Sequence, residues 1–200
     1  MAGCTLYVLW SQGHRTDSSV INPDTQFRDL GSFPVDETIM VASLSFLVLV
    51  GLFQFGDVIA WLNDYDKELT FECTENQYVS EIKSQHSNRY EDRQWEYACR
   101  ALPSGVMTNQ CKWYRDVNEM NELLAFRCMG SQVVTGVTSR HDNHYEDRVF
   151  GFRCCDITKF KLENCLITSF INSYDGFMNY ILPHDYVIIG MDSEHDNHYQ

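Results

Sequence analysis

The segment YVSEIKSQHSNRYEDR at residues 78–93 returns as VVTGVTSRHDNHYEDR at residues 133–148 and, in shortened form, as VIIGMDSEHDNHYQ at residues 187–200. The copies start 55 and then 54 residues apart. A constant period of this length indicates a fold built from a repeated supersecondary unit. The sequence therefore predicts three tandem repeats, the third of them truncated: unit 1 (residues 61–115), unit 2 (116–169) and unit 3 (170–200).

Each unit shows the alternation of apolar and polar residues that is typical of β-strands. The segments LTFEC at residues 69–73 and LAFRC at residues 124–128 place Phe and Cys on one face, and WEYAC at residues 95–99 does the same for Trp, Tyr and Cys. Helical periodicity is weak, and only residues 117–125 could form a short helix. We predict an all-β fold in which three similar sheets surround a pseudo-threefold axis in a β-prism-like arrangement.

The chain is acidic, with a formal net charge of −13 and a sequence pI of about 4.8. Nucleic-acid binding requires clustered Lys and Arg that neutralise phosphates, and the sequence contains no basic run. We therefore expect no nucleic-acid partner. A polyanion would have to use a local patch, for which the candidates are Arg89, Arg93, Arg100, Arg140, Arg148 and Arg153.

The cysteines are numerous for a chain of this size. Eight are present, and seven of them lie between Cys73 and Cys165. Their spacing includes no Cys-x-x-Cys pair of the kind that holds zinc. In a small repeat protein this density indicates a disulfide-stapled fold in an oxidising compartment.

The first sixty residues differ from the repeats. Residues 39–53 are uncharged and mostly apolar, a run of fifteen that is short for a membrane span but typical of the hydrophobic region of a signal peptide, and the uncharged stretch extends from residue 38 to residue 56. Small residues just before Trp61 are typical of a cleavage site. We predict a signal peptide at residues 40–60 and a disordered upstream extension at residues 1–39. The alternative is a signal anchor, which the absence of flanking Lys or Arg disfavours.

Four residue types are identical in all three copies of the repeated segment: Ser84, Ser139 and Ser193; His86, His141 and His195; Asn88, Asn143 and Asn197; Tyr90, Tyr145 and Tyr199. They alternate along the chain, so an extended strand would place them on one face. This face is a structural hydrogen-bonding network, a ligand-binding surface repeated three times, or a His cluster around a metal ion. A second His follows at His144 and His198, but Arg89 takes that place in the first copy, so we expect no metal.

An Asp-Arg pair follows the segment in units 1 and 2. Arg93 and Arg148 share the parity of the inward aromatic residues, and a buried guanidinium needs a carboxylate partner. We expect that carboxylate to be one of the two acidic residues directly before each arginine. The alternative is a phosphate or sulfate site on these arginines.

The segment DRQWEYAC at residues 92–99 resembles the repeated Asp-Arg-[Glu/Gln]-Trp-x-[Phe/Tyr]-x-Cys motif of the dermatopontin family, which includes the invertebrate hemagglutinin/amebocyte aggregation factors. WLN at residues 61–63 and the adjacent pair Cys154 and Cys155 are also similar to that family, and the resemblance covers residues 61–200. Phe replaces the motif's Trp in unit 2, and the third motif is absent. The motif positions are Asp92, Arg93, Trp95, Tyr97, Asp147, Arg148, Phe150 and Phe152.

The resemblance implies a disulfide pattern. It suggests Cys73–Cys99, together with bridges from Cys111 and Cys128 to the adjacent pair Cys154 and Cys155. It leaves Cys165 with a partner beyond Gln200, and it leaves Cys4, which precedes the predicted signal peptide, with none.

The resemblance also implies a secreted extracellular-matrix or cell-adhesion protein that needs no cofactor. Its expected partners are proteoglycans or sulfated glycans, matrix proteins and cell-surface glycans, and it is expected to agglutinate cells. We expect no enzyme, because the sequence offers no Ser-His-Asp or Cys-His set, and adjacent acids such as Glu91 and Asp92 face opposite ways on a strand. The alternative is a membrane-active, toxin-like defence protein. The chain shows no long amphipathic hairpin, so stable membrane insertion is not expected.

Overall fold

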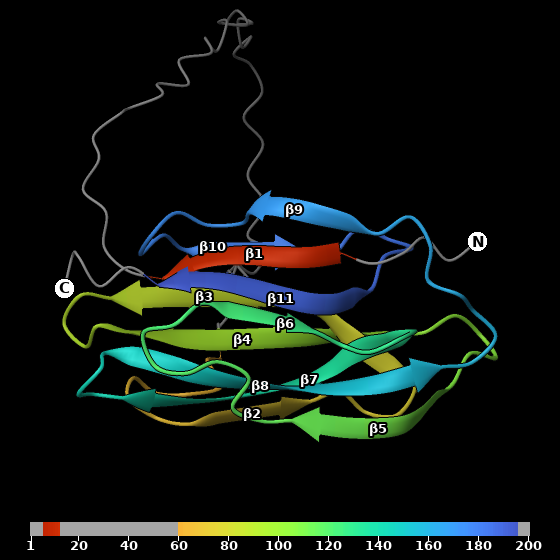
Figure 1. Cartoon of the computed structure of the whole chain (residues 1–200), viewed down its shortest axis with the longest axis horizontal. Helices are drawn as coiled ribbons and strands as arrows, with labels where there is room; N and C mark the ends of the chain where they lie inside the picture. Colours follow the sequence, from red (N-terminus) through yellow and green to blue (C-terminus); the bar gives the residue numbers. More distant parts are fainter. Residues whose placement is uncertain (1–5, 13–59, 196–200) are drawn as a thin grey trace, which may run out of the picture. The chain divides into compact units, whose positions relative to one another are not determined.

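The computed structural model describes residues 6–12 and 60–195, and these residues form an all-β structure with no helix (Figure 1). The prediction of an all-β fold is therefore confirmed. No helix of the described residues is long and apolar enough to cross a membrane. The predicted signal peptide lies outside the described residues except for Ala60.

The strands follow the repeat. In each unit a short strand comes first and one or two long strands follow it. The eleven strands are β1 (Leu6–Gln12), β2 (Leu69–Glu72), β3 (Gln77–Ser87), β4 (Asp92–Ala101), β5 (Thr108–Tyr114), β6 (Leu124–Arg127), β7 (Gln132–Asp142), β8 (Asp147–Ile157), β9 (Leu166–Phe170), β10 (Met178–Ile181) and β11 (Ile188–His195). The short helix considered for residues 117–125 is wrong, because residues 117–123 form bends and turns before β6 begins.

Each short strand pairs with a long strand of another unit. β2 of unit 1 pairs antiparallel with β7 of unit 2, β6 of unit 2 with β11 of unit 3, and β10 of unit 3 with β3 of unit 1. The residue after each short strand repeats one backbone hydrogen bond of 2.8 Å: Cys73 N to Thr135 O, Cys128 N to Ile189 O, and Leu182 N to Ser80 O. The three units are therefore joined in a closed cycle.

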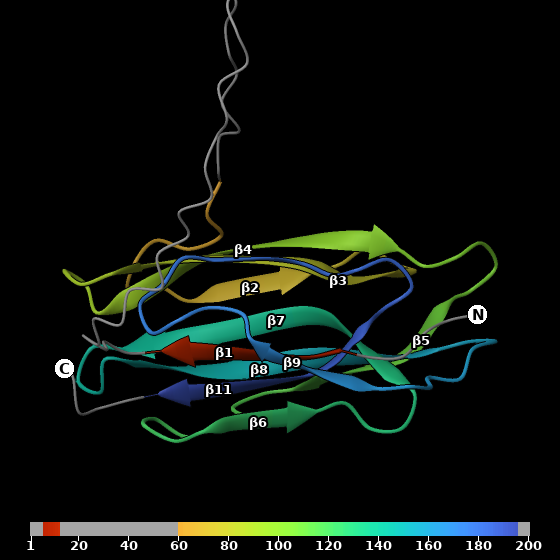
Figure 2. The same ribbon diagram turned by 90° about the horizontal axis from the view of Figure 1, so that it is seen from above.

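This exchange produces three sheets, with the strand orders β2-β7-β8-β5, β10-β3-β4 and β6-β11-β1-β9 (Figure 2). β1 lies between β11 and β9 and is parallel to both. The prediction of disorder for residues 1–39 is therefore wrong for Leu6–Gln12. The error arose because this segment was judged by its place upstream of the predicted signal peptide, although its Leu, Tyr, Val and Trp side chains favour a strand.

The inward faces of the long strands form the core. In β4 the residues from Arg93 to Tyr97 are buried alternately, as the period of a strand requires, whereas β8 is buried on both faces from Asp147 to Phe152. Trp95 and Phe150 meet edge to face with ring centroids 5.6 Å apart, and Trp95 stacks with Tyr97 as Phe150 stacks with Phe152. Such ring pairs stabilise a core by about 1 kcal/mol beyond their burial. The aromatic motif positions therefore serve packing.

The disulfides match the predicted pattern. Cys73–Cys99 joins the end of β2 to β4, and Cys128–Cys154 joins the end of β6 to β8, so each bridge links two sheets. Cys111–Cys155 links β5 and β8 within one sheet. Cys165 is also disulfide-bonded, with a partner outside the described residues, so the prediction of a partner beyond Gln200 is wrong. Cys4 lies outside the described residues.

Candidate functional site

Two buried polar clusters occupy the end of the domain where the hairpins turn. We call them the Arg148 cluster (Arg148, Asp92, His141 and Ser139) and the Arg93 cluster (Arg93, Ser84, His86 and Asp175). Within each hairpin the histidine lies opposite the arginine, His141 opposite Arg148 and His86 opposite Arg93. The alternation of the two strands therefore turns both side chains toward the interior.

Arg148 pairs with a carboxylate from another unit. Its Nε lies 2.6 Å from Asp92 Oδ1, and its Nη2 lies 2.7 Å from Asp92 Oδ2, which is the bidentate geometry of a strong ion pair. Both side chains are about 1% exposed. Nη2 also donates to the Lys67 carbonyl, and the backbone N–H of Asp66 donates to Asp92. The carboxylate is therefore fully engaged.

The expected partner of Arg148 was wrong. Adjacent residues of a strand point to opposite sides, so Asp147 does not turn to Arg148 and instead accepts a hydrogen bond from its backbone N–H. The ion pair crosses from unit 1 to unit 2, which a search for carboxylates close in sequence does not reveal.

His141 completes the Arg148 cluster. Its Nδ1 lies 3.2 Å from Asp92 Oδ1, and its Nε2 lies 3.4 Å from Glu146 Oε2. Burial opposes the charged imidazole, but the hydrogen bond and negative charge of Asp92 outweigh it and raise the pKa of His141. In the same way, burial opposes ionisation of Asp92, while His141 and Arg148 hold the pKa of its carboxyl well below the ordinary value.

The Arg93 cluster has the same residue types without that carboxylate. Arg93 Nε donates to Ser84 Oγ at 2.9 Å, and Nη2 donates to the Gly176 carbonyl. No ion pair to Arg93 forms within the described part of the chain. Burial lowers the pKa of Arg93 to about 10, so the guanidinium still carries its charge at neutral pH.

The charged groups around His86 differ from those around His141. Its Nε2 is 3.4 Å from Asp175 Oδ1 and 4.0 Å from Glu91 Oε2. Burial nevertheless lowers the pKa of His86, and the nearby positive charge of Arg93 acts in the same direction against the attraction of Asp175. The pKa values of two histidines at equivalent positions are thus shifted in opposite directions.

A third contact follows the same rule: His195 Nδ1 of unit 3 lies 3.5 Å from Asp147 Oδ1 of unit 2. The aspartate of one unit meets the histidine of the next. Ser84, Ser139 and Ser193 are also buried. The repeated Ser and His columns therefore lie in the structural interior between units.

The prediction that the repeated Ser, His, Asn and Tyr residues share one strand face is wrong for the asparagines and tyrosines. Asn88 and Tyr90 of unit 1, like Asn143 and Tyr145 of unit 2, lie in the hairpin turns and are exposed. The turns are closed by Tyr90 N to Ser87 O and Tyr145 N to Asp142 O. A strand period does not extend through a turn, so these side chains leave the face of the serines and histidines. Asn197 and Tyr199 lie outside the described residues.

A surface groove crosses the outer face of the β2-β7-β8-β5 sheet. Trp113 on β5 lies opposite Arg153 on β8, and the Arg115 guanidinium lies 5.2 Å from the Trp113 ring centroid. Gly136 makes room for this indole, because a Cβ there would lie 3.1 Å from Trp113 Cη2 and 2.8 Å from a backbone oxygen. The face therefore presents a half-buried aromatic ring among cationic side chains.

Two hollows share the lining residue Asp116, and Trp113 lines neither of them. The first, of about 170 Å³, has lining residues that include Glu68, Arg115, Asp116, Thr138, Arg140 and Gly151. The second, of about 430 Å³, has lining residues that include Asp116, Asn118, Glu119, Met120, Arg140 and Tyr145. Because Arg140 and Asp116 line both, we call them together the Arg140 groove. Arg140 Nε lies 3.3 Å from Asp116 Oδ1.

The six arginines considered for anion binding lie in different surroundings. Arg93 and Arg148 are buried in the clusters, and Arg100 donates to the carbonyls of Leu182 and Pro183. Arg89 lies over Tyr90 in a hairpin turn. Arg140 and Arg153 lie on the outer face with Arg115, which the sequence analysis missed. Its spacing from Trp113, two residues along a strand, was the available signal.

The described residues contain no group of three or more His, Cys, Asp or Glu side chains placed to hold a metal ion. Both nitrogens of His141 face carboxylates. The chemistry of the clusters is therefore that of ion pairs and hydrogen bonds.

These features define a repeat-built, disulfide-stapled β domain with an inter-unit polar interior and a polar outer groove. The chain belongs to the dermatopontin family, whose model matches residues 63–200. It is 42% identical over 144 residues to the hemagglutinin/amebocyte aggregation factor of Limulus polyphemus, covering 70% of this chain and 80% of that protein. It is 34% identical over 137 residues to a dermatopontin of Biomphalaria glabrata, covering 68% and 90%.

A third relative, Millepora cytotoxin-1 of Millepora dichotoma, is 35% identical over 139 residues, which are 70% of this chain and 61% of that protein. No solved structure matches the chain.

Proposed function

We propose that this protein is a secreted, non-enzymatic adhesion protein of the extracellular matrix that binds glycans through the Arg140 groove and can agglutinate cells. The observation that carries the proposal is the similarity to a hemagglutinin/amebocyte aggregation factor over 80% of that protein. Three inter-strand disulfides suit an oxidising, extracellular compartment. The cyclic pairing of the short strands supports the further proposal of a pseudo-threefold, β-prism-like architecture.

The groove has the chemistry that sugars require. Carboxylates and guanidiniums, here Glu68, Asp116, Arg115 and Arg140, can accept and donate hydrogen bonds to hydroxyl groups. Tyr145 provides aromatic surface in the larger hollow, and Trp113 lies outside the lining, against the Arg115 side chain that lines the smaller one. Because Arg140 pairs with Asp116 and Arg153 with Glu72, positive charge is partly balanced. Recognition therefore rests on hydrogen bonds and ring contacts as well as on charge, so cell-surface glycans fit alongside sulfated ones.

The test is agglutination of erythrocytes and retention on immobilised heparin and dermatan sulfate, with Arg140→Ala and Trp113→Ala as variants. Loss of one charged hydrogen bond costs about 1.5–3 kcal/mol, so agglutination titre or retention should fall by about 10-fold or more. Arg89→Ala is the matched control, because it removes an equally exposed arginine outside the groove. Equal behaviour of R140A and R89A would place glycan binding elsewhere, and no agglutination or retention by the unaltered protein would refute the function.

Ionic strength separates the two glycan classes. Screening weakens contacts between exposed charges as salt rises. Binding that disappears between low and physiological salt therefore identifies a sulfated glycan, and binding that persists identifies an uncharged one.

A second function, attack on membranes, is favoured by one observation, the 35% identity to Millepora cytotoxin-1. Release of a trapped dye from phospholipid vesicles by the unaltered protein would support it. Intact vesicles at concentrations that agglutinate cells would exclude it.

A further inference from the structure

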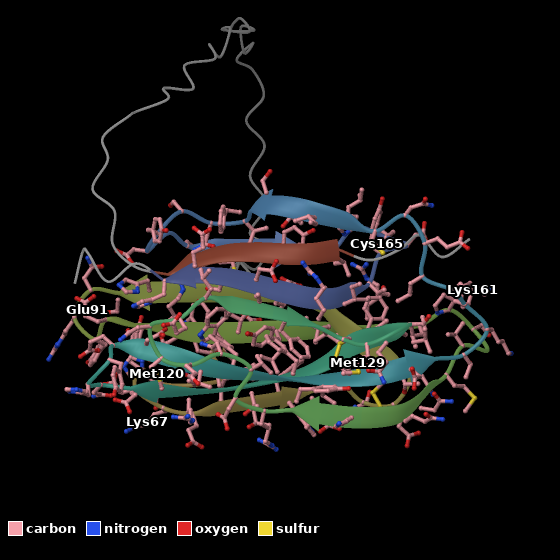
Figure 3. All side chains as sticks on the ribbon, in the orientation of Figure 1. Lys67, Glu91, Met120, Met129, Lys161 and Cys165 are labelled. Atoms are coloured by element: carbon pink, nitrogen blue, oxygen red, sulfur yellow. A yellow bond between two sulfur atoms is a disulfide. The ribbon has the colours of Figure 1, made fainter. Side chains whose placement is uncertain are left out.

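A cavity lies at the opposite end of the domain from the hairpin turns. Its apolar lining includes Tyr78, Leu102, Val106, Ile157, Leu162 and Tyr186, and its volume is about 410 Å³. We call it the Val106 cavity. In Figure 3, Glu91 of a hairpin turn lies at one end of the domain, and Lys161, beside the lining residues Phe160 and Leu162, lies at the other.

Residues from all three units build the cavity. Tyr78 and Val106 come from unit 1, Ile157 and Leu162 from the end of β8 and the segment after it, and Tyr186 from the turn before β11. The unit 1 segment is fixed by the hydrogen bonds from Leu102 N to Asn76 O and from Val106 N to Pro103 O. The walls are therefore held by backbone contacts.

The floor of the cavity is the hydrophobic core itself. Tyr78 and Val187 belong to the core cluster, and Leu102, Ile157 and Leu162 pack against it. Val106 is 4% exposed. A volume of this size is within the range of small-molecule pockets, roughly 300–1,000 Å³. The hollow thus offers an apolar site large enough for a ligand.

The polar groups at the wall do not favour water or an ion. Both terminal nitrogens of Arg100 already donate to the carbonyls of Leu182 and Pro183. The other charged lining residue, Asp185, has the opposite sign and lies on an exposed turn. Water is held in a cavity by several polar partners, and the side chains that line this cavity are mostly apolar. Neither sign of ligand charge gains a clear advantage.

We propose that the Val106 cavity binds an uncharged apolar moiety, the size of a small ring system or a short acyl chain. The apolar moiety can belong to a free small molecule or to the tail of a lipid, since both present the same chemistry to the walls. The proposal is independent of glycan binding, because the Arg140 groove shares no lining residue with this cavity.

The test uses the uncharged dye N-phenyl-1-naphthylamine, whose fluorescence rises in an apolar site. The unaltered full chain should show saturable binding of one dye molecule. Leu162→Trp should weaken it at least 10-fold by filling the cavity. Leu166→Trp, which adds the same indole four residues away on β9, should leave it unchanged. Non-saturating fluorescence, or equal binding by L162W and L166W, would overturn the proposal.

A second measurement does not depend on a variant that folds. In hydrogen exchange of the unaltered protein, saturating dye should slow exchange in residues 101–107 and 157–162 and leave the β7–β8 turn unchanged. No protection in these two segments would overturn the proposal. Flotation of L162W and L166W with phosphatidylcholine vesicles then shows whether the bound apolar group belongs to a lipid tail or to a free small molecule. Co-flotation lost only in L162W identifies a lipid tail, and dye binding without flotation identifies a free molecule.

Discussion

The Arg148 and Arg93 clusters contain the same three residue types at equivalent positions, yet their electrostatics differ. Arg148 has the Asp92 carboxylate in bidentate contact, and the pKa of the neighbouring His141 is raised. Arg93 has a serine hydroxyl and a backbone carbonyl instead, and the pKa of His86 is lowered. At His141 the hydrogen bond and charge of Asp92 outweigh burial, whereas at His86 burial outweighs the attraction of Asp175.

The largest effect is expected for Asp92→Asn. This change leaves Arg148 buried without a counter-charge, and breaking a buried pair in this way costs about 3–5 kcal/mol. Asp175→Asn in the other cluster should cost clearly less, because Asp175 is 14% exposed and lies 3.4 Å from His86 Nε2, whereas Asp92 is 1% exposed and bidentate to Arg148. Urea unfolding of both variants measures the difference. Equal losses would show that the two clusters are equivalent after all.

Arginine geometry provides the next test. A lysine at position 148 keeps the charge but not the two parallel hydrogen bonds, so Arg148→Lys should lower the unfolding free energy by about 2 kcal/mol. Arg93 makes no bidentate contact with a carboxylate, and Arg93→Lys should lose about half as much. The predicted difference between the clusters is wrong if R93K lowers the unfolding free energy more than R148K in the same urea titration.

The pH dependence of the two histidines should be opposite. Because the pKa of His141 is raised above 6.5, its contribution to stability is full below that value and is lost as pH rises through the folded pKa. Because the pKa of His86 is lowered, its contribution is present above 6.5 and is lost as pH falls through the folded pKa.

Histidine ring NMR should therefore show His141 titrating above pH 6.5 and His86 below it. His141→Gln should flatten the decline of stability on the alkaline side, and His86→Gln should flatten the decline on the acid side. Each effect should be on the order of 1 kcal/mol. Both histidines titrating on the same side would remove the electrostatic distinction between the clusters.

The smallest effects are expected at two glutamates of the hairpin turns, for Glu146→Gln and Glu91→Gln. Glu146 lies 3.4 Å from His141 Nε2, but its side chain is 33% exposed. A partly exposed pair of this kind contributes about 0–1 kcal/mol. Glu91→Gln, at 4.0 Å from His86, should have less effect still. A shift in the His141 titration that exceeds the one in D92N would mean that Glu146, not Asp92, controls this histidine.

The features that could be predicted from the sequence are those set by residues close together in the chain or by motifs of the family. Strand alternation correctly placed Trp95 and Phe150 in the core, and the resemblance to the family implied the three disulfides that form. The 55-residue period correctly indicated a repeated unit, since β2, β6 and β10 recur with it.

What the sequence did not predict depends on contacts between units. The period does not say that β2 pairs with β7, or that Asp92 crosses to Arg148, because the same motif is present in both units and offers two choices of partner. The alternation rule failed at Asn88 and Tyr90 because a turn interrupts the strand. The Arg140 groove joins residues of four segments that carry no shared motif.

The closed cycle of strand exchange has a consequence for biosynthesis. As the chain leaves the ribosome, Cys73 and Cys99 are only 26 residues apart and can be oxidised early. β3, however, remains an uncovered sheet edge until β10 has emerged. An uncovered edge can pair with other chains, and sheet contacts between distant segments form slowly. The first unit can therefore be cross-linked before its sheet is complete, and the edge of β3 stays open until the third unit has been synthesised.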